Sequence, residues 1–404
     1  MEFFMNILER LSQRLEWEQY YDHKLQQGNM SEKDAKDLYS FIANEEYLPA
    51  VQRIYREEPF PAPKKKLIGK AGVKKKRVVY TYGREENYIL KLVAFLLRKY
   101  DSIFAPNLYS FRKNTGVKAA INELLKVKDL GSRYVYKVDI SDYFNSVDIE
   151  TLMPELCKVL SDEPELFGFI RSLLECPHAE IDGELVRERK GIMAGVPISG
   201  FLANLNLRDM DSFFYERNIP YMRYSDDIIV FAKTEEELHS YIELIKKILA
   251  DRRLQVNEAK EIISQPGEQW SFLGFSFLNG VIDICPVSLG KLKAKMRRKT
   301  HALARWASRK GVPGQAAARA FVKRFNAKLY DNPVYSELTW SRWFSPVINT
   351  DRTLAEIDTY MQECIRYLAT GKRTKARFNY RYDEIKTLGY RSLVNEYYKQ
   401  KNNE

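Results

Sequence analysis

Two adjacent carboxylates, Asp226 and Asp227, lie between apolar runs at 221–222 and 228–231. This pattern is typical of a hairpin that presents acids at its tip. Neighbouring carboxylates repel each other, and their cost beside a sheet falls when they share a cation. The pair therefore predicts a divalent metal site. A solvated turn is the alternative, because Asp is also a common turn residue.

A third carboxylate, Asp139, ends an apolar strand that we predict over 134–140. If this strand neighbours the Asp226 hairpin in one sheet, three carboxylates meet and could hold two Mg²⁺ ions. Such a pair of ions activates an attacking hydroxyl and stabilises the leaving oxygen in an in-line phosphoryl displacement. For Asp139 alone, a helix cap at the end of the strand is the alternative.

The elements that must position these acids follow from hydrophobic periodicity and turn residues. In chain order we predict helices over 1–50, a basic hairpin over 59–84, helices over 85–100 and 116–128, the strand over 134–140, helices to about 175, a charged loop near 180–190, a glycine turn at 191–195 with a helix after it, the Asp226 hairpin, a helix opened by a capping box at Thr234 and Glu237, a short strand near 254–256, an aromatic strand-turn at 270–275, and helices beyond about 285. This order predicts an α+β fold in which helices cover one face of a sheet.

Length and composition place the chain among large folded proteins. Its 404 residues are 45% hydrophobic, enough for a large core and two or three subdomains. No apolar stretch has the length of a membrane span and the first residues lack a signal-peptide pattern, so we expect a cytoplasmic protein without a membrane partner. The four cysteines are scattered and form no zinc-ligand spacing with the one nearby histidine; they are Cys157, Cys176, Cys285 and Cys364.

The positive charge is concentrated near the C-terminus. Residues 291–404 hold 25 Lys and Arg against 10 Asp and Glu, whereas the whole chain carries a net charge of +11. A basic unit beside a near-neutral one predicts binding to a polyanion through phosphate contacts. A solvated basic surface that serves solubility is the alternative.

Seven motifs occur in a recognisable order. They are the basic stretch at 70–80, Tyr109-Ser110-Phe111-Arg112, Val138-Asp139-Ile140 continuing to Tyr143-Phe144, Gly191-Ile192-Met193-Ala194-Gly195-Val196-Pro197-Ile198-Ser199, Tyr224-Ser225-Asp226-Asp227, Asn257-Glu258-Ala259-Lys260 and Phe272-Leu273-Gly274-Phe275. This ordered set resembles the catalytic core of reverse transcriptases over roughly residues 60–280. The resemblance implies a right-hand polymerase with an N-terminal helical extension at 1–58, fingers at 59–133, a palm with an antiparallel sheet at 134–284 that carries a fingers insertion at about 150–190, and a basic α-helical thumb or RNA-binding region at 285–404.

The resemblance also implies roles for individual residues. Asp139 and Asp226 would bridge two Mg²⁺ ions, for which Mn²⁺ could substitute, with the Ile140 carbonyl and Asp227 as further ligands. Lys260 would protonate the leaving pyrophosphate, although a surface lysine is nearly as good an interpretation. The residues expected to bind the incoming nucleotide are Lys70, Lys75, Arg77, Phe144, Ala194 and Gly195.

Within that nucleotide-binding set, Phe144 and Ala194 are the positions that predict how the nucleotide is held. Phe144 would lie under the sugar, where a 2′ hydroxyl would clash, so we expect a preference for deoxynucleotides; a core aromatic is the alternative. Many family members have Gln where this chain has Ala194, so a side-chain hydrogen bond to the nucleotide is absent. For Lys70, Lys75 and Arg77, a generic phosphate-rich surface is the alternative to a triphosphate grip.

The C-terminal region interleaves basic and aromatic residues, which suits a helix lying along nucleic acid. The residues expected to contact nucleic acid are Lys295, Arg298, Arg305, Trp306 and Arg309, followed by a second cluster of Lys372, Arg373, Lys375 and Arg377. The second cluster could hold a structured RNA, recognised by shape and backbone. Solvated helical faces are the alternative for both sets.

Within the family, the chain is most similar to bacterial defence-associated reverse transcriptases of the unknown group, with the type 2 single-protein systems as the nearest match. It has no Gln-Gly-Gly run of intron enzymes and no Val-Thr-Gly of retron enzymes. The resemblance implies a polymerase that copies a structured noncoding RNA into cDNA from dNTPs in antiphage defence. A retron-like or diversity-generating enzyme, untemplated or protein-primed synthesis, and a maturase-type RNA-binding role remain as alternatives. The sequence does not predict the oligomeric state.

Overall fold

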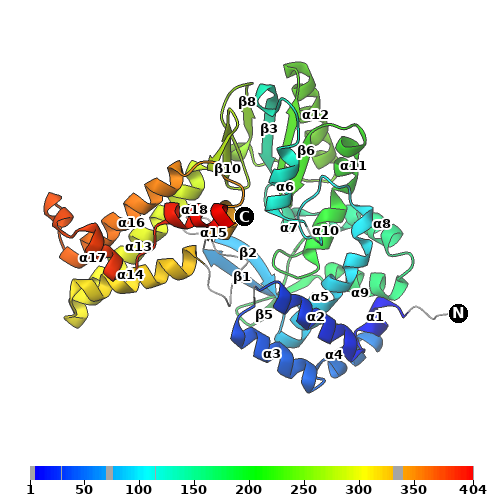
Figure 1. The fold of residues 1–404 in the computed structure, drawn as a ribbon. Helices are drawn as coiled ribbons and strands as arrows, with labels where there is room; N and C mark the ends of the chain where they lie inside the picture. The colour runs from blue at the N-terminus through cyan, green and yellow to red at the C-terminus, as the bar shows by residue number, and fades with distance from the viewer. Residues whose placement is uncertain (1–4, 29, 70–75, 114, 331–339, 404) are drawn as a thin grey trace. The chain divides into compact units, whose positions relative to one another are not determined.

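The structure is a computed structural model that describes residues 5–28, 30–69, 76–113, 115–330 and 340–403 (Figure 1). It has the predicted α+β fold, with many helices and with sheets whose strands are mostly antiparallel. The chain divides into two compact units, one of Met1–Gln26 and Glu32–Pro266, the other of Gln27–Ser31 and Gly267–Glu404. In the described part of the chain, no helix is both long and apolar enough to cross a membrane.

The first unit is organised around a four-stranded antiparallel sheet in the order β6-β7-β3-β8. Its strands are β3 (Tyr134–Asp139), β6 (Tyr221–Tyr224), β7 (Asp227–Ala232) and β8 (Ile262–Ser264). The apolar, β-branched sequence of β7 suits a strand that is buried on both faces, and every residue of β7 after Asp227 is buried. The predicted neighbourhood of the Asp139 strand and the Asp226 hairpin is confirmed.

Helices pack against this sheet (Figure 1). The helix α12 (Glu235–Asp251) contacts β3 and β7, and α11 (Arg208–Glu216) contacts β6. The predicted cap of α12 is confirmed, because the Thr234 hydroxyl oxygen accepts a hydrogen bond of 3.2 Å from the Glu237 amide. The Glu237 carboxylate accepts in turn from the Lys233 amide at 2.9 Å, one residue earlier than a standard capping box.

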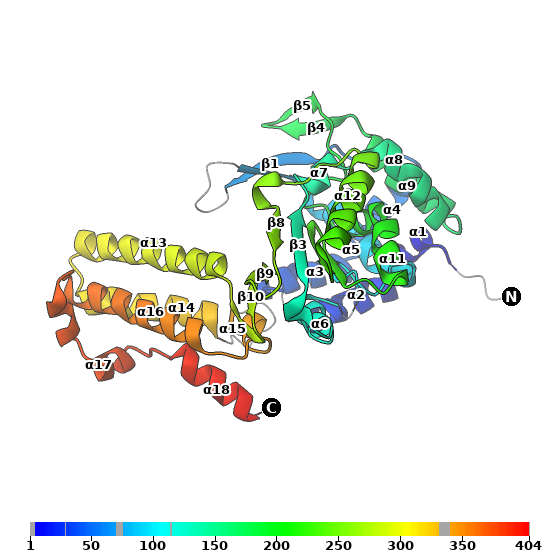
Figure 2. The ribbon, with the colours of Figure 1, turned by 90° about the horizontal axis from the view of Figure 1, so that it is seen from above.

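A second sheet has the order β2-β1-β4-β5. Figure 2 shows the β4–β5 hairpin near β1. The predicted basic hairpin is confirmed as β1 (Lys64–Gly69) and β2 (Lys76–Thr81). The predicted charged loop near 180–190 is wrong, because β4 (His178–Ile181) and β5 (Glu184–Arg187) form a hairpin there, and β4 pairs in parallel with β1. The missed signal is Asp182-Gly183, whose φ angles of +52° and +93° are those of a two-residue hairpin turn.

The predicted N-terminal helices are confirmed, and they pack on the helix that follows the basic hairpin. The helices α2 and α4 both contact α5, and α2 also contacts α3. The remaining elements of this unit are α1 (Ile7–Arg10), α2 (Arg14–Gln26), α3 (Glu32–Ala43), α4 (Tyr47–Tyr55), α5 (Arg84–Leu96), η1 (Leu97–Ile103), α6 (Val117–Leu124), η2 (Leu130–Ser132), α7 (Tyr143–Ser146), α8 (Ile149–Val159), α9 (Pro164–Glu175), α10 (Ser199–Asn206) and η3 (Glu258–Lys260).

The strand predicted near 254–256 is wrong, since only a single bridge joins Ile140 and Val256 there.

The second unit opens with a three-stranded antiparallel sheet in the order β11-β10-β9, which confirms the predicted aromatic strand-turn. These strands, which we predicted as the end of the palm, belong by their contacts to the C-terminal unit. In the helical part, α13, α14 and α16 pack against one another (Figure 2). The elements are β9 (Trp270–Phe272), β10 (Phe275–Leu278), β11 (Val281–Ile284), α13 (Pro286–Lys310), α14 (Gly314–Leu329), α15 (Trp340–Phe344), α16 (Arg352–Thr370), η5 (Lys375–Asn379), α17 (Tyr382–Thr387) and α18 (Leu393–Asn403).

One buried carboxylate ties the last helix to this bundle. Asp358 on α16 is 6% exposed and accepts hydrogen bonds from the Tyr390 hydroxyl at 2.8 Å and the Ser392 hydroxyl at 2.6 Å. It also accepts from the amides of Leu393 and Val394, at 2.8 and 3.2 Å. These amides lie in the first turn of α18 and have no acceptor within their own helix. Asp358 therefore caps α18 from a neighbouring helix.

Replacing Asp358 with Ala is expected to destabilise the C-terminal unit by about 2–4 kcal/mol, because it leaves several buried donors without an acceptor. Urea denaturation followed by tryptophan fluorescence and circular dichroism measures the free energy of unfolding. The matched control is Asp383→Ala, since the Asp383 side chain is 90% exposed and lies 3.3 Å from the Lys386 ammonium on the same helix. Equal stability of the two variants would contradict the capping role.

Candidate active site

The three predicted acids gather at one end of the central sheet. Asp139 is the last residue of β3, Asp226 lies in the turn between β6 and β7, and Asp227 is the first residue of β7. The β3–β7 register places Asp139 opposite Asp227, and the Ile140 amide donates to the Asp226 carbonyl at 3.1 Å. At the tip, Ser225 has a φ of +60°. The hairpin predicted from the sequence therefore delivers both of its acids to the strand that carries the third.

The electrostatics of this cluster reflect three like charges. Burial, and then the charges of Asp139 and Asp227, raise the pKa of Asp226 above its ordinary value. Asp139 is 7% exposed, and the Lys260 ammonium lies 2.7 Å from each of its carboxylate oxygens. The Lys137 ammonium lies 3.9 Å from Asp227 Oδ1. Two lysines thus offset part of the negative charge. The repulsion that remains is seen in the raised pKa of Asp226.

The donor set fits a divalent cation in its chemistry. Carboxylate oxygens and backbone carbonyls are the ligands that Mg²⁺ prefers, and a cation here would reverse the like-charge repulsion that raises the pKa of Asp226. As the side chains stand, no group of three or more His, Cys, Asp or Glu within the described residues could hold a metal ion. The Lys260 ammonium donates to both oxygens of Asp139, so a metal bound by Asp139 would share that carboxylate with Lys260 or displace its ammonium.

A buried ion pair supports the acid turn from below. The Arg223 guanidinium donates to both carboxylate oxygens of Asp211, at 2.8 and 2.5 Å, and both side chains are 0% exposed. Burial alone would lower the pKa of Arg223, but Asp211 holds it above its ordinary value. Arg223 also donates to the Ser225 carbonyl at 3.2 Å, and the Tyr221 hydroxyl donates to Asp211 at 2.9 Å. The sequence analysis did not identify this pair, because neither Arg223 nor Asp211 belongs to one of the seven motifs.

The segment at 107–110 braces the same turn from the side. The Ser225 amide donates to the Ser110 hydroxyl at 2.8 Å, and this hydroxyl donates to the Asn204 side chain at 3.2 Å. Leu108 forms a parallel bridge with Arg223. The motif at 109–112 therefore supports the acids through its serine, whereas Arg112 donates to backbone carbonyls at 101, 105 and 108.

The glycine turn lies against the basic hairpin. Gly195 has a φ of +100°, and a Cβ at Gly195 would lie 3.0 Å from the Tyr80 carbonyl oxygen. The Tyr80 amide donates to the Ala194 carbonyl at 2.7 Å. Asn145 joins the two segments, because its side chain accepts from the Ala194 amide at 3.0 Å and donates to the Val78 carbonyl at 3.3 Å. Asn145 is a positioning residue that the sequence analysis missed, although it directly follows Phe144.

Phe144 lies beside the same turn. Its ring is partly buried and meets the Phe111 ring edge-on, with centroids 6.0 Å apart, and its carbonyl accepts from the Ile192 amide at 2.8 Å. Arg77 is exposed on β2 and shares a strand face with Val79, whose Cβ lies 3.5 Å from the Cβ position of Gly195. Of the nucleotide-binding set, Phe144, Ala194 and Gly195 thus lie together, with the face that carries Arg77 next to them.

Two residues of that set, Lys70 and Lys75, lie outside the described residues. The nucleic-acid set lies in the C-terminal unit. On α13 the four basic residues follow a helical spacing that places them in one exposed stripe, and the Trp306 side chain beside them is 36% exposed. The stripe consists of Lys295, Arg298, Arg305 and Arg309. In the second cluster, Lys372, Arg373 and Lys375 are exposed and Arg377 is partly buried. Their role in binding nucleic acid stays a prediction.

A family model identifies the family of this chain. Residues 63–277 match the family model described as reverse transcriptase (RNA-dependent DNA polymerase). A search of curated proteins found no match.

Among solved structures, an apo telomerase from Candida tropicalis, truncated from its C-terminal domain, is 17% identical with a TM-score of 0.44, over 56% of this chain and 55% of that one. Telomerase from Candida albicans with a fragment of telomeric RNA is 11% identical with a TM-score of 0.45, over 87% and 68%. A chain of a partial Cas6-RT-Cas1–Cas2 complex is 20% identical with a TM-score of 0.35, over 61% and 43%.

Proposed function

The chain belongs to the reverse transcriptase family, and from this premise we propose that it is an RNA-directed DNA polymerase that makes cDNA from a structured noncoding RNA. The observation that carries the proposal is the meeting of three carboxylates at one end of the sheet, within a domain that the family model matches. The raised pKa of Asp226 supports a cation-binding role, since such repulsion costs stability unless a cation is bound.

The residues present have separable tasks in this reaction. Asp139, Asp226, Asp227 and the Ile140 carbonyl would hold two Mg²⁺ ions, with Mn²⁺ as a substitute. When bound, such ions supply charge stabilisation at the attacking 3′ oxygen and at the leaving pyrophosphate. Lys260, whose Nζ donates to Asp139, would be the residue that gives a proton to the leaving pyrophosphate.

The nucleotide would bind beside the glycine turn, on the surface that the turn forms together with β2. Gly195 lets the backbone approach closely, Asn145 fixes that backbone against Val78, and Arg77 supplies a planar guanidinium for the triphosphate. Because Ala194 offers no polar side chain, grip on the nucleotide depends on these backbone and charged groups.

Replacing Phe144 with Ala is expected to admit ribonucleotides, because removing the ring relieves the clash with a 2′ hydroxyl. We expect the ratio of kcat/KM for a ribonucleotide to that for the matching deoxynucleotide to rise roughly 10- to 200-fold. The matched control is Phe144→Tyr, which keeps the bulk of the ring and the edge-on contact with Phe111. An unchanged ratio in Phe144→Ala would remove Phe144 from the selection of the sugar.

The RNA template and a role in bacterial antiphage defence are the finer parts of the proposal. The basic C-terminal unit, with its exposed stripe on α13, supports binding of a nucleic-acid backbone. The defence role rests on the resemblance of the motifs to unknown-group reverse transcriptases.

Incorporation of labelled dTTP on oligo(dT)-primed poly(rA) with Mg²⁺ tests the polymerase. We expect template-dependent synthesis by the wild type and none by Asp226→Ala/Asp227→Ala. Sequencing of the nucleic acid that copurifies with the chain then identifies the template and the product. Synthesis that proceeds equally without RNA would contradict the templated reaction, and equal activity of the wild type and the double variant would contradict the site.

A further inference from the structure

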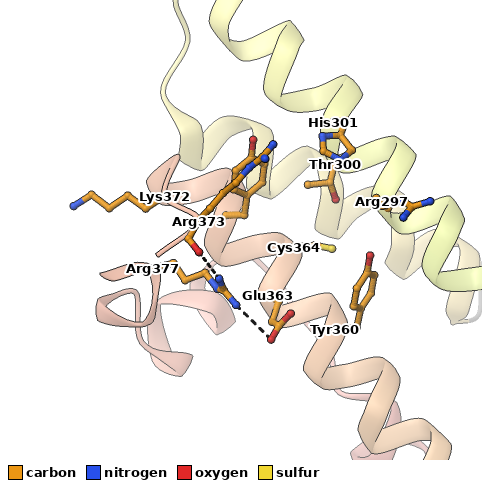
Figure 3. A pocket seen from close by; sticks show the side chains of 10 residues that line it. Arg297, Thr300, His301, Tyr360, Glu363, Cys364, Lys372, Arg373 and Arg377 are labelled. Carbon is orange, nitrogen blue, oxygen red and sulfur yellow. Dashed lines mark hydrogen bonds and ion pairs between the residues drawn. The ribbon is translucent and has the colours of Figure 1, made fainter. Parts of the chain in front are cut away.

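A pocket of about 360 Å³ opens in the C-terminal unit, between α13, α16 and the loop that follows α16 (Figure 3). Arg297 and His301 are one turn apart on α13, and Tyr360 and Glu363 lie on α16. Arg373 comes from the loop. The volume of the pocket is within the range of roughly 300–1,000 Å³ that is common for small-molecule sites. All walls of the pocket belong to the same compact unit.

The walls are strongly positive. Four permanent cations, Arg297, Lys372, Arg373 and Arg377, line the pocket with a single carboxylate, Glu363. Among the described residues, Arg377 is the one of these four with an acidic partner, at 3.6 Å from Glu363. Such an excess of unpaired guanidinium groups favours a ligand with phosphate oxygens, which arginine binds through two parallel hydrogen bonds.

Internal contacts hold the loop that closes the pocket. Arg377 donates to the Arg373 carbonyl at 2.7 Å, and its Nε is buried without a hydrogen-bond partner among the described residues. The Arg373 guanidinium lies over the Tyr367 ring, 5.5 Å from its centroid. Arg373 is exposed in spite of this contact, so its outer face is available to a ligand.

The remaining walls are aromatic or neutral. Tyr360 and Tyr367 are partly buried and lie two turns apart on α16, while Thr300 and Cys364 are buried between the helices. Burial raises the pKa of the Cys364 thiol to about 11, so this wall carries no charge at neutral pH. An aromatic and neutral interior beside a guanidinium edge suits a planar base attached to a phosphate.

We propose that this pocket binds one unstacked nucleotide of a single-stranded nucleic acid, with its base against Tyr360 and its phosphate on Arg373. The inference rests on the proposed function, in that an RNA template supplies the strand, and it adds a site for an extruded base to the exposed stripe on α13. A nucleotide held there anchors the strand by its base and by its backbone together.

Fluorescence anisotropy with a labelled short single-stranded RNA, in EDTA so that no synthesis occurs, tests the inference in the full chain. The same RNA without its bases forms the second arm, and a DNA strand of the same sequence forms the third. The variants are Tyr360→Leu, which removes the aromatic face but keeps apolar volume, and Arg373→Glu. Lys323→Glu is the charge-matched control, since Lys323 is exposed on α14 and does not line the pocket.

Tyr360→Leu is expected to raise the Kd for RNA roughly 5- to 100-fold and to leave the Kd for base-free RNA unchanged. Arg373→Glu is expected to weaken both ligands more than Lys323→Glu does, and to reduce the slope of log Kd against log salt by about one. The DNA arm shows whether the sugar contributes, because equal Kd values assign recognition to base and phosphate alone.

Equal effects of Tyr360→Leu on RNA and base-free RNA would overturn the base-binding role, as would no effect on either. Equal weakening by Arg373→Glu and Lys323→Glu would reduce the pocket to part of a diffuse basic surface. These binding measurements do not depend on synthesis. If templated incorporation fails while Tyr360→Leu and Arg373→Glu still weaken RNA binding as expected, the proposed function is contradicted. The inference about the pocket then still holds.

Discussion

Asp226→Asn is expected to abolish templated incorporation and at the same time to stabilise the metal-free protein. Activity should fall on the order of 10³-fold or more, because several kcal/mol of metal-borne charge stabilisation is lost. Stability should rise because burial and the charges of Asp139 and Asp227 raise the pKa of Asp226, so its ionised form opposes folding. A variant that loses activity while it gains stability cannot owe its loss to unfolding.

The stability gain has a defined pH dependence. A carboxyl with a raised folded-state pKa binds its proton more tightly in the folded protein, so the wild type loses stability as the pH rises from the unfolded-state pKa, about 4, through the folded-state value. The difference in free energy of unfolding between Asp226→Asn and the wild type should therefore be small near pH 4 and largest at neutral pH. Thermal or urea unfolding in EDTA at several pH values measures this difference.

Asp182→Asn is the matched control for this experiment. Asp182 is exposed in the β4–β5 turn and has a φ of +52°, a conformation that Asn adopts readily. It should keep full activity and show no pH-dependent gain in stability. Normal activity of Asp226→Asn would remove Asp226 from the metal site, and a loss of stability at neutral pH would contradict the like-charge cluster.

Arg223→Met is expected to destabilise the first unit by about 3–5 kcal/mol, because it leaves the Asp211 carboxylate buried without its charge partner. The Ser225 carbonyl also loses the hydrogen bond that Arg223 donates at 3.2 Å. The turn that carries Asp226 and Asp227 then loses its support from below. Urea denaturation and the incorporation assay, on the same preparation, measure both effects.

The double variant Arg223→Met/Asp211→Leu separates stability from positioning. It replaces both buried charges with apolar groups, which is often neutral for stability, so most of the lost free energy of unfolding should return. The Ser225 carbonyl still lacks its donor, and the Tyr221 hydroxyl loses its acceptor, so we expect incorporation to stay low. Recovery of full activity in the double variant would show that the ion pair serves folding alone.

Much of the fold could be predicted because it is encoded locally. The strand around Asp139, the hairpin at Asp226 and the cap of α12 each depend on a few consecutive residues whose periodicity or turn chemistry is visible in the sequence. The β4–β5 hairpin is equally local, but its charged composition is typical of a loop, and only its Asp182-Gly183 turn indicates a hairpin. The strand expected at 254–256 failed for a different reason, since only one bridge forms where β3 ends.

The active-site prediction divides in the same way. The order of the motifs indicated which acids belong together, and the β3–β7 register puts Asp139 opposite Asp227. The support for these acids was not visible, because Asp211, Ser110 and Asn145 act through contacts with residues that are distant in the chain. The sequence analysis predicted that Lys260 protonates the leaving pyrophosphate. The contact of its ammonium with Asp139 is visible only in the structure, where η3 packs beside β3.

The sequence by itself determined the fold class, the acids and their order, and the basic character of the C-terminal unit, since each is a property of residue type and short-range spacing. Only the tertiary structure decided which charges meet. It buried Arg223 against Asp211, placed Lys260 on Asp139, and formed a cationic pocket between α13 and α16. The physical reason is that the energy of a charge depends on its burial and on its neighbours, and packing sets both across long stretches of chain.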